Sequence, residues 1–343
     1  MSRRLPVYVL LDCSESMIGP GIEGLRIAVA AMLRELRRNP QALDSVWLSF
    51  ITFDGEARQV APLTPLDDVQ APMLQVHPGT ALGGALRLAT ASIRREVKRT
   101  TANEKGDFRP LIFLITDGQP TDEWQSAVRD LDTRTGTRPA NVYAIGCGAD
   151  VDFAQLGKIT DIVLRLDNVN AEGFAKLFVW LSASVHSAST GVADADPAAL
   201  LAKLPSDLAK IDLTKVPAHD GRSRQLFLRV HCIQKRGAYL MRFRLDESIG
   251  LYRGVTSHPL EAAGGRENAT EFRLPAVDSR LLVGCPPCPY CPSDVAATCS
   301  NCDSLFCLPS RNPPAQVVCP SCGDSISRSE EASGSFMVRQ STG

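Results

Sequence analysis

The N-terminal half of the chain alternates short apolar runs with longer amphipathic segments. Apolar runs at residues 7–11, 45–53, 110–116, 141–146 and 161–166 have the length of buried strands. Between them, apolar residues recur with helical spacing over residues 21–38, 82–97 and 171–186. Shorter helices are predicted near residues 119–124, with Thr121 as N-cap, and near residues 152–158. Strands that alternate with helices predict an α/β fold with a doubly wound, mostly parallel sheet.

One strand of this sheet has a different pattern. The more polar run at residues 57–63 follows the strand at residues 45–53 after a short turn that begins with Asp54. A turn this short joins antiparallel strands, so we expect an antiparallel strand at the sheet edge. Asp54 is predicted to act in the turn and not as a ligand.

The C-terminal half has a different composition. We expect a first domain at residues 1–190 and a linker with a short helix at residues 191–215. A small β-rich segment is predicted at residues 216–278, with strands at 225–232, 238–245 and 271–274. A cysteine-rich module follows at residues 279–325. The tail at residues 326–343 is rich in serine, glycine and charge, and is predicted to be disordered.

Composition and charge narrow the class of protein. Hydrophobic residues make up 44% of the chain and charged residues 22%, with a formal net charge of -1, as in an ordinary globular protein. No overall basic excess points to nucleic acid or to an anionic membrane. No apolar run approaches the ~20 residues of a membrane helix, and the first one stops at Asp12 without a cleavage site. We therefore expect a cytoplasmic protein.

Oxygen-bearing side chains follow two of the predicted strands. Asp12, Ser14 and Ser16 come directly after the first strand, and Asp117 ends the strand at residues 110–116. Thr80 lies in a glycine-rich turn before the second long helix. Each residue alone could be a cap or turn residue. Together they fit a magnesium site, because hard oxygen ligands suit this ion and ligands gather at the carboxyl ends of parallel strands.

These three ordered motifs resemble the von Willebrand factor A-type family over roughly residues 5–188. The resemblance implies a metal-ion-dependent adhesion site in which Ser14, Ser16 and Thr80 touch magnesium (or manganese or calcium) directly or nearly so. Asp12 and Asp117 would hold the ion partly through water. An open coordination position would take a carboxylate from a protein partner.

Eight cysteines cluster in the C-terminal module. In a chain without an export signal such a cluster favours metal over disulfides. Two cysteines separated by two residues can face one zinc ion. Eight thiolates could fill two closed, structural four-cysteine sites, although the number of zinc ions and the grouping of the cysteines stay open. Cys285 or Cys291 would be spare if seven ligate. The predicted zinc ligands are Cys285, Cys288, Cys291, Cys299, Cys302, Cys307, Cys319 and Cys322.

The module has a poor charge pattern for binding phosphate. Between Arg280 and Asp324 it carries only Arg280 and Arg311 against Asp294, Asp303 and Asp324. We therefore expect it to bind protein or stabilise the fold, and not to bind nucleic acid.

The chain, with its two halves in this order, resembles the TerY-like proteins of bacterial tellurite-resistance and stress systems. The resemblance rests on the oxygen motif and on tail motifs such as Cys288-Pro-Tyr-Cys291 and Cys319-Pro-Ser-Cys322. The resemblance implies an accessory protein in stress, tellurite-resistance or phage-defence systems, with a kinase or phosphatase as candidate partner. The leading hypothesis is a non-enzymatic adaptor that binds an acidic residue through magnesium. Alternatives are a magnesium-dependent phosphohydrolase that uses Asp12 or Asp117 and a nucleic-acid binder that uses the zinc module.

Overall fold

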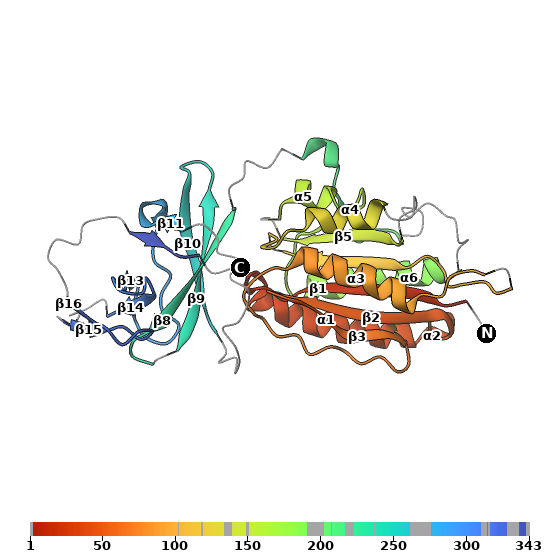
Figure 1. Ribbon diagram of the computed structural model, residues 1–343, viewed down its shortest axis with the longest axis horizontal. Helices are drawn as coiled ribbons and strands as arrows, with labels where there is room; N and C mark the ends of the chain where they lie inside the picture. Colours follow the sequence, from red (N-terminus) through yellow and green to blue (C-terminus); the bar gives the residue numbers. More distant parts are fainter. Residues whose placement is uncertain are drawn as a thin grey trace. The chain divides into compact units, whose positions relative to one another are not determined.

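The chain forms two compact units, residues Met1–Asp220 and Gly221–Gly343, each described here by itself. The computed structural model describes residues 3–101, 103–117, 119–133, 139–148, 151–190, 202–206, 208–216, 223–235, 237–260, 276–309, 314, 316–327 and 336–340. Figure 1 shows an N-terminal unit of helices and strands and a C-terminal unit made mostly of strands.

The N-terminal unit is organised around a seven-stranded sheet in the order β3-β2-β1-β4-β5-β6-β7. Its strands are β1 (Leu5–Asp12), β2 (Val46–Phe53), β3 (Ala57–Pro65), β4 (Leu111–Thr116), β5 (Asn141–Cys147), β6 (Val163–Leu166) and β7 (Leu208–Lys210). The five central strands are parallel, whereas β3 and β7 pair antiparallel at the two edges. The predicted doubly wound sheet with an antiparallel edge strand at residues 57–63 is confirmed.

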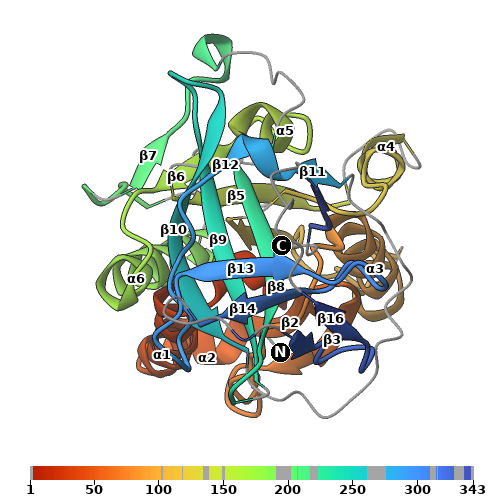
Figure 2. The same ribbon diagram turned by 90° about the vertical axis from the view of Figure 1, so that its left-hand side faces the viewer.

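Helices cover both faces of this sheet, as Figure 2 shows. One face packs against α1 (Pro20–Arg37), α2 (Pro40–Ser45) and α6 (Ala171–Thr190), and the other against α3 (Leu82–Glu96), α4 (Gln125–Thr133) and α5 (Phe153–Gly157). Successive residues of a strand point to opposite faces, so Val9 joins the first core and Leu10 the second. All eight residues of β1 are buried, which explains its unbroken apolar sequence.

Two predictions for this unit need correction. The segment predicted as linker and short helix contributes β7, which pairs with β6 and extends the sheet. The helix predicted from residue 119 begins at Gln125, because the preceding residues connect β4 to the loop that carries Thr80.

The C-terminal unit contains a six-stranded sheet in the order β12-β10-β9-β8-β14-β13. Its strands are β8 (Gln225–Cys232), β9 (Ala238–Asp246), β10 (Leu251–Pro259), β12 (Leu282–Val283), β13 (Val295–Thr298) and β14 (Leu305–Leu308). Two smaller sheets pair β11 (Val277–Asp278) with β17 (Met337–Val338) and β15 (Gln316–Val318) with β16 (Ser325–Ser327). The structure contains the predicted 225–245 hairpin. The sequence pattern missed β10, and the strand predicted at residues 271–274 lies outside the described residues.

This sheet joins two segments that the sequence pattern separates. Strand β14 of the cysteine-rich module pairs in parallel with β8 of the β-rich segment, so both segments share one sheet and one core. Part of the predicted disordered tail is also structured, because β17 pairs with β11 and Val338 is buried. Within the described ranges, no helix combines the length and the apolar character that crossing a membrane requires.

Candidate metal sites

The carboxyl ends of β1 and β4 meet at the point where the strand order of the first unit reverses. The chain leaves β1 through α1 on one face of the sheet and reaches β4 through α3 on the other. Such a switch point is the usual ligand site of an open α/β sheet, because the two connections diverge there. Asp12 is the last residue of β1, and Asp117 directly follows β4. Both side chains are buried.

Hydrogen bonds join the oxygen-bearing side chains that follow these two strands. Asp12 Oδ1 accepts from the Ser14 amide at 2.9 Å, and Asp12 Oδ2 accepts from the Thr116 hydroxyl. The Ser14 and Ser16 hydroxyl oxygens are 2.8 Å apart. Ser16 Oγ donates to Asp117 Oδ1 at 2.5 Å. Four of the five predicted magnesium ligands therefore lie in one continuous cluster.

The fifth predicted ligand, Thr80, lies on a buried loop at the same end of the sheet. The amide of the next residue, Ala81, donates to the carbonyl of Asp54, just beyond β2, at 2.6 Å. The Thr80 amide donates to Thr121 Oγ1 at 2.9 Å, and the Thr121 amide donates back to the Thr80 carbonyl at 3.0 Å. Thr121 is thus not the predicted helix cap. It fixes the Thr80 loop to the segment that follows Asp117.

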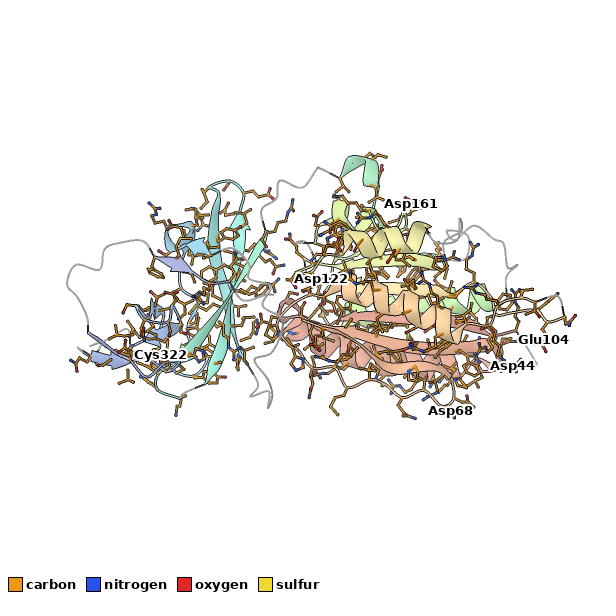
Figure 3. All side chains as sticks on the ribbon, viewed as in Figure 1. Asp44, Asp68, Glu104, Asp122, Asp161 and Cys322 are labelled. Atoms are coloured by element: carbon orange, nitrogen blue, oxygen red, sulfur yellow. The ribbon has the colours of Figure 1, made fainter. Side chains whose placement is uncertain are left out.

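Glycines and one aspartate allow this loop to turn into α3. Gly79 has a φ of 98°, and a Cβ there would lie 2.6 Å from the Gly55 Cα, so both conformation and space require glycine. Two amides in the first turn of α3, those of Gly83 and Gly84, donate to the two carboxylate oxygens of Asp122 at 2.9 and 2.7 Å. The helix is therefore capped by a residue that is distant in sequence. Figure 3 labels Asp122 at the end of the unit opposite Glu104.

The oxygen cluster contains two buried carboxylates, those of Asp12 and Asp117. Burial, and to a smaller extent the nearby Asp54 carboxylate, raise the pKa of Asp12 to about 6, although hydrogen bonds from Ser14 and Thr116 oppose the shift. Burial raises the pKa of the Cys147 thiol well above its usual value, and the Asp117 and Asp12 carboxylates add to the effect. A divalent cation would offset this charge, and the hard oxygen donors are of the kind that magnesium binds.

The neighbouring Asp54 is balanced in another way. Its carboxylate accepts from the Glu56 amide at 3.0 Å, as expected for a turn residue, and lies 2.9 Å from Arg58 Nη1 and 3.0 Å from His77 Nδ1. Arg58 therefore supplies the counter-charge for Asp54. Asp12 and Asp117 remain the carboxylates best placed to hold a cation.

The C-terminal unit contains two groups of four cysteines whose sulfur atoms all lie within 4.8 Å of one another. Measured sulfur–sulfur distances are 3.7 Å for Cys232–Cys291 and 3.6 Å for Cys291–Cys307 in the first group. They are 3.7 Å for both Cys299–Cys322 and Cys302–Cys319 in the second. Four sulfurs about 2.3 Å from one tetrahedral zinc ion would be about 3.8 Å apart. A disulfide would need about 2.05 Å, so the spacing fits zinc.

The first group is built on the six-stranded sheet. Its members are Cys232, Cys288, Cys291 and Cys307. Cys232 is the last residue of β8, and Cys307 lies opposite it in β14 in the parallel register. Cys288 and Cys291 come from a tight turn in which the Cys288 amide donates to the Ser293 carbonyl at 2.7 Å. Two strands and one turn thus deliver four sulfurs to one point.

The second group joins two turns of the same design. In one, the Cys299 amide donates to the Ser304 carbonyl at 2.9 Å, and in the other the Cys319 amide donates to the Asp324 carbonyl at 2.8 Å. Each turn contributes its two cysteines, which gives Cys299, Cys302, Cys319 and Cys322. These are the turns that the two-residue spacing predicted.

The structure differs from the predicted ligand set at one position. Cys285 lies outside both groups, with its sulfur 4.0 Å from Met241 Sδ. Cys232 occupies the ligand position that the sequence predicted for Cys285. The sequence pattern does not single out Cys232, because its partners are more than fifty residues away and Lys235 occupies the position where a second cysteine would complete the motif. A signal existed: Cys232 ends a predicted strand at the start of a tight turn, the position that cysteines occupy in the tail.

Comparisons with known proteins agree with this division of the chain. A model of the von Willebrand factor type A domain matches residues 7–174, and a model of the TerY-C metal binding domain matches residues 224–343.

Solved structures are similar to parts of the chain. Proximal thread matrix protein 1 from the mussel byssus shares 17% identity over 54% of this chain and 48% of its own, with a TM-score of 0.43, and has also been solved with a zinc-occupied adhesion motif. BatB from Bacteroides thetaiotaomicron shares 19% identity over 55% of this chain and 100% of its own, with a TM-score of 0.35. The chain spans about half the length of the mussel protein.

The two family matches coincide with the two units found in the structure. The predicted resemblance is confirmed on both halves. This chain therefore contains a von Willebrand factor type A domain at residues 7–174, followed by a TerY-C metal binding domain at residues 224–343.

Proposed function

We propose that the chain is a metal-dependent adaptor that binds an acidic residue of a protein partner at the Asp12–Asp117 cluster. The observation that carries the proposal is the contact chain from Asp12 through Ser14 and Ser16 to Asp117, which gathers hard oxygen donors from two strand ends. A magnesium ion bound there would offer an open coordination position for a carboxylate. Asp12, Asp117, Ser14, Ser16 and Thr80 would hold the ion.

The protein residues have separate tasks in this proposal. The Ser14 amide and the Thr116 hydroxyl orient the Asp12 carboxylate, and Thr121 fixes the Thr80 loop. The buried, hydrogen-bonded donors need little rearrangement when the ion binds, so an incoming carboxylate can replace one water without rebuilding the site.

The two cysteine groups would each hold one structural zinc ion, because four thiolates leave no open position for catalysis. We propose that the zinc-stabilised unit offers a second contact to the partner. The TerY-C match supports a role in a tellurite-resistance or other stress system. The resemblance to TerY-like proteins makes a kinase or a phosphatase the candidate partner.

A pull-down with and without magnesium, with captured proteins identified by mass spectrometry, tests the proposal. Asp117→Ala and Ser14→Ala should abolish capture while the unit stays folded, because each removes one donor from a preformed cluster. Glu104→Ala is the matched control, since it removes an exposed carboxylate from the opposite end of the unit. Capture that persists in both variants or in chelator would refute the mechanism.

A further inference from the structure

The two cysteine groups differ in what holds their ligands in place. In the first group, Cys232 and Cys307 are register partners on the hydrogen-bonded strands β8 and β14. Strand pairing therefore places two of the four sulfurs at neighbouring positions. In the second group all four cysteines lie in turns, and no two of them are strand partners.

The groups also differ in burial. Three of the four cysteines of the first group are buried, and all four pack with the apolar side chains of β8 and β9. The second group belongs to a smaller cluster built around Phe306, and Cys322 is exposed. Solvent and chelators therefore reach the second group more easily than the first.

Strand β14 connects the two groups through the alternation of its side chains. Leu305 and Cys307 point to the core of the first group, whereas Phe306 and Leu308 pack in the cluster of the second. The turn that carries Cys299 and Cys302 closes the hairpin of β13 and β14. The first site therefore positions half of the second.

The other half of the second group depends on its own ion. Cys319 and Cys322 lie in the turn between β15 and β16, which among the described strands pair only with each other. An isolated two-stranded hairpin is marginally stable in water. We expect this hairpin to lose its structure when the second site is empty.

We propose that the two zinc sites lose their ions in a fixed order. The Cys232 site keeps its zinc and supports the sheet, whereas the Cys322 site exchanges its zinc and depends on the first site. The proposal rests on the zinc assignment made above. It makes the β15–β16 hairpin a metal-controlled part of the molecule. The turn of the second site also contacts the C-terminal segment, since Arg339 forms an ion pair with Asp303 at 3.0 Å. Loss of this zinc would therefore release the hairpin and remove the support of the turn that holds Asp303 beside Arg339.

Stepwise removal of zinc from the full chain tests the order. The zinc-loaded protein is treated with excess EDTA, and free thiols are alkylated at intervals and located by mass spectrometry. We expect two release phases, the first at least about tenfold faster. The first equivalent should expose Cys299, Cys302, Cys319 and Cys322 to alkylation, and the second should expose Cys232, Cys288, Cys291 and Cys307.

Three variants separate the two sites. Cys322→Ser should bind one zinc ion, released in the slow phase. Cys232→Ser should lose both phases, because the second site loses its support. Cys285→Ser, which changes a cysteine outside both groups, should behave as the wild type.

Other outcomes would overturn the proposal in distinguishable ways. Release of both ions in one phase would refute the order and leave the zinc assignment standing. The same holds if the Cys232→Ser protein still binds one ion at the second site as tightly as the wild type. A wild-type chain that binds no zinc would refute the assignment itself.

Discussion

The two units hold their candidate metal ligands together in different ways. In the N-terminal unit the oxygen cluster lies at the end of strands that are buried on both faces by helices, and its side chains hold one another by hydrogen bonds. In the C-terminal unit five of the cysteines are themselves among the buried side chains of the core, as at Cys232, Cys307 and Cys299. We therefore expect the first unit to fold before it binds an ion, and the second unit to depend on its ions for folding.

This difference matches the proposed tasks. A site that exchanges a water for a partner's carboxylate benefits from a scaffold that is stable without the ion. A unit whose buried side chains include five cysteines would gain part of its folding free energy from closed thiolate sites. Four predictions test this difference between the units.

The largest effect should follow the loss of the first zinc site. Cys307→Ser removes one of its four ligands and should unfold the C-terminal unit, because structural zinc contributes about 10–16 kcal/mol in small zinc domains. The N-terminal unit should stay folded. Hydrogen exchange measured by mass spectrometry should show lost protection in the strands of the C-terminal unit, such as β8 and β9, and unchanged protection in the N-terminal sheet. Unchanged protection of these strands would mean that the sheet folds without zinc.

A change beside the oxygen cluster should have a smaller effect. A Cβ at Gly83 would lie 2.4 Å from the carbonyl oxygen of Glu123 and 2.7 Å from the Trp124 Cα, so Gly83→Ala must displace the segment that anchors the Thr80 loop. We expect a loss of about 1–3 kcal/mol in unfolding free energy and weaker magnesium binding. Urea unfolding and calorimetric titration measure the two quantities.

The neighbouring glycine provides the matched control. At Gly84 the nearest atoms to an added Cβ are 3.5 Å away, so Gly84→Ala should be neutral or stabilise α3 by up to about 1 kcal/mol. Equal behaviour of the two variants would show that the close contact at Gly83 does not support the site.

The pH should change how strongly magnesium stabilises the first unit. Burial raises the pKa of Asp12 to about 6 from an ordinary 3.8, so the metal-free native state binds a proton that the unfolded chain releases. The metal-free unit should therefore lose stability as the pH rises from about 4 to about 6. Magnesium binds the deprotonated carboxylate, so its stabilising effect should grow over the same range. The difference in Tm between magnesium and EDTA should be larger at pH 7 than at pH 5, and an equal difference would argue against Asp12 as a ligand.

The smallest effect should come from the ninth cysteine of the C-terminal unit, which belongs to neither group of four. Cys285 lies outside both sulfur groups, so Cys285→Ala should change the zinc content not at all and the stability by no more than about 1 kcal/mol. Zinc analysis and thermal unfolding provide the check. A loss of one zinc ion would return Cys285 to the ligand set that the sequence predicted.

Much of the fold could be predicted from the sequence because its signals are local. The unbroken apolar run of β1 predicts a strand buried on both faces, and helical spacing predicts α1 and α3 to within a residue or two. The turns at Cys299 and Cys319 follow from the two-residue spacing of their cysteines, since six consecutive residues suffice to make each turn. The donors Asp12, Ser14 and Ser16 are likewise set by one short motif.

Only the tertiary structure decided which distant segments meet. Cys232 completes a sulfur group because β8 pairs with β14, and Asp122 caps α3 because the segment after β4 folds over the helix N-terminus. The β7 strand joins the sheet for the same reason, although its sequence is too short to show a pattern. These pairings depend on the packing free energy of whole elements, which no local run of residues records. The sequence therefore determined the kinds of candidate ligand, and the fold determined which of them lie close enough to share an ion.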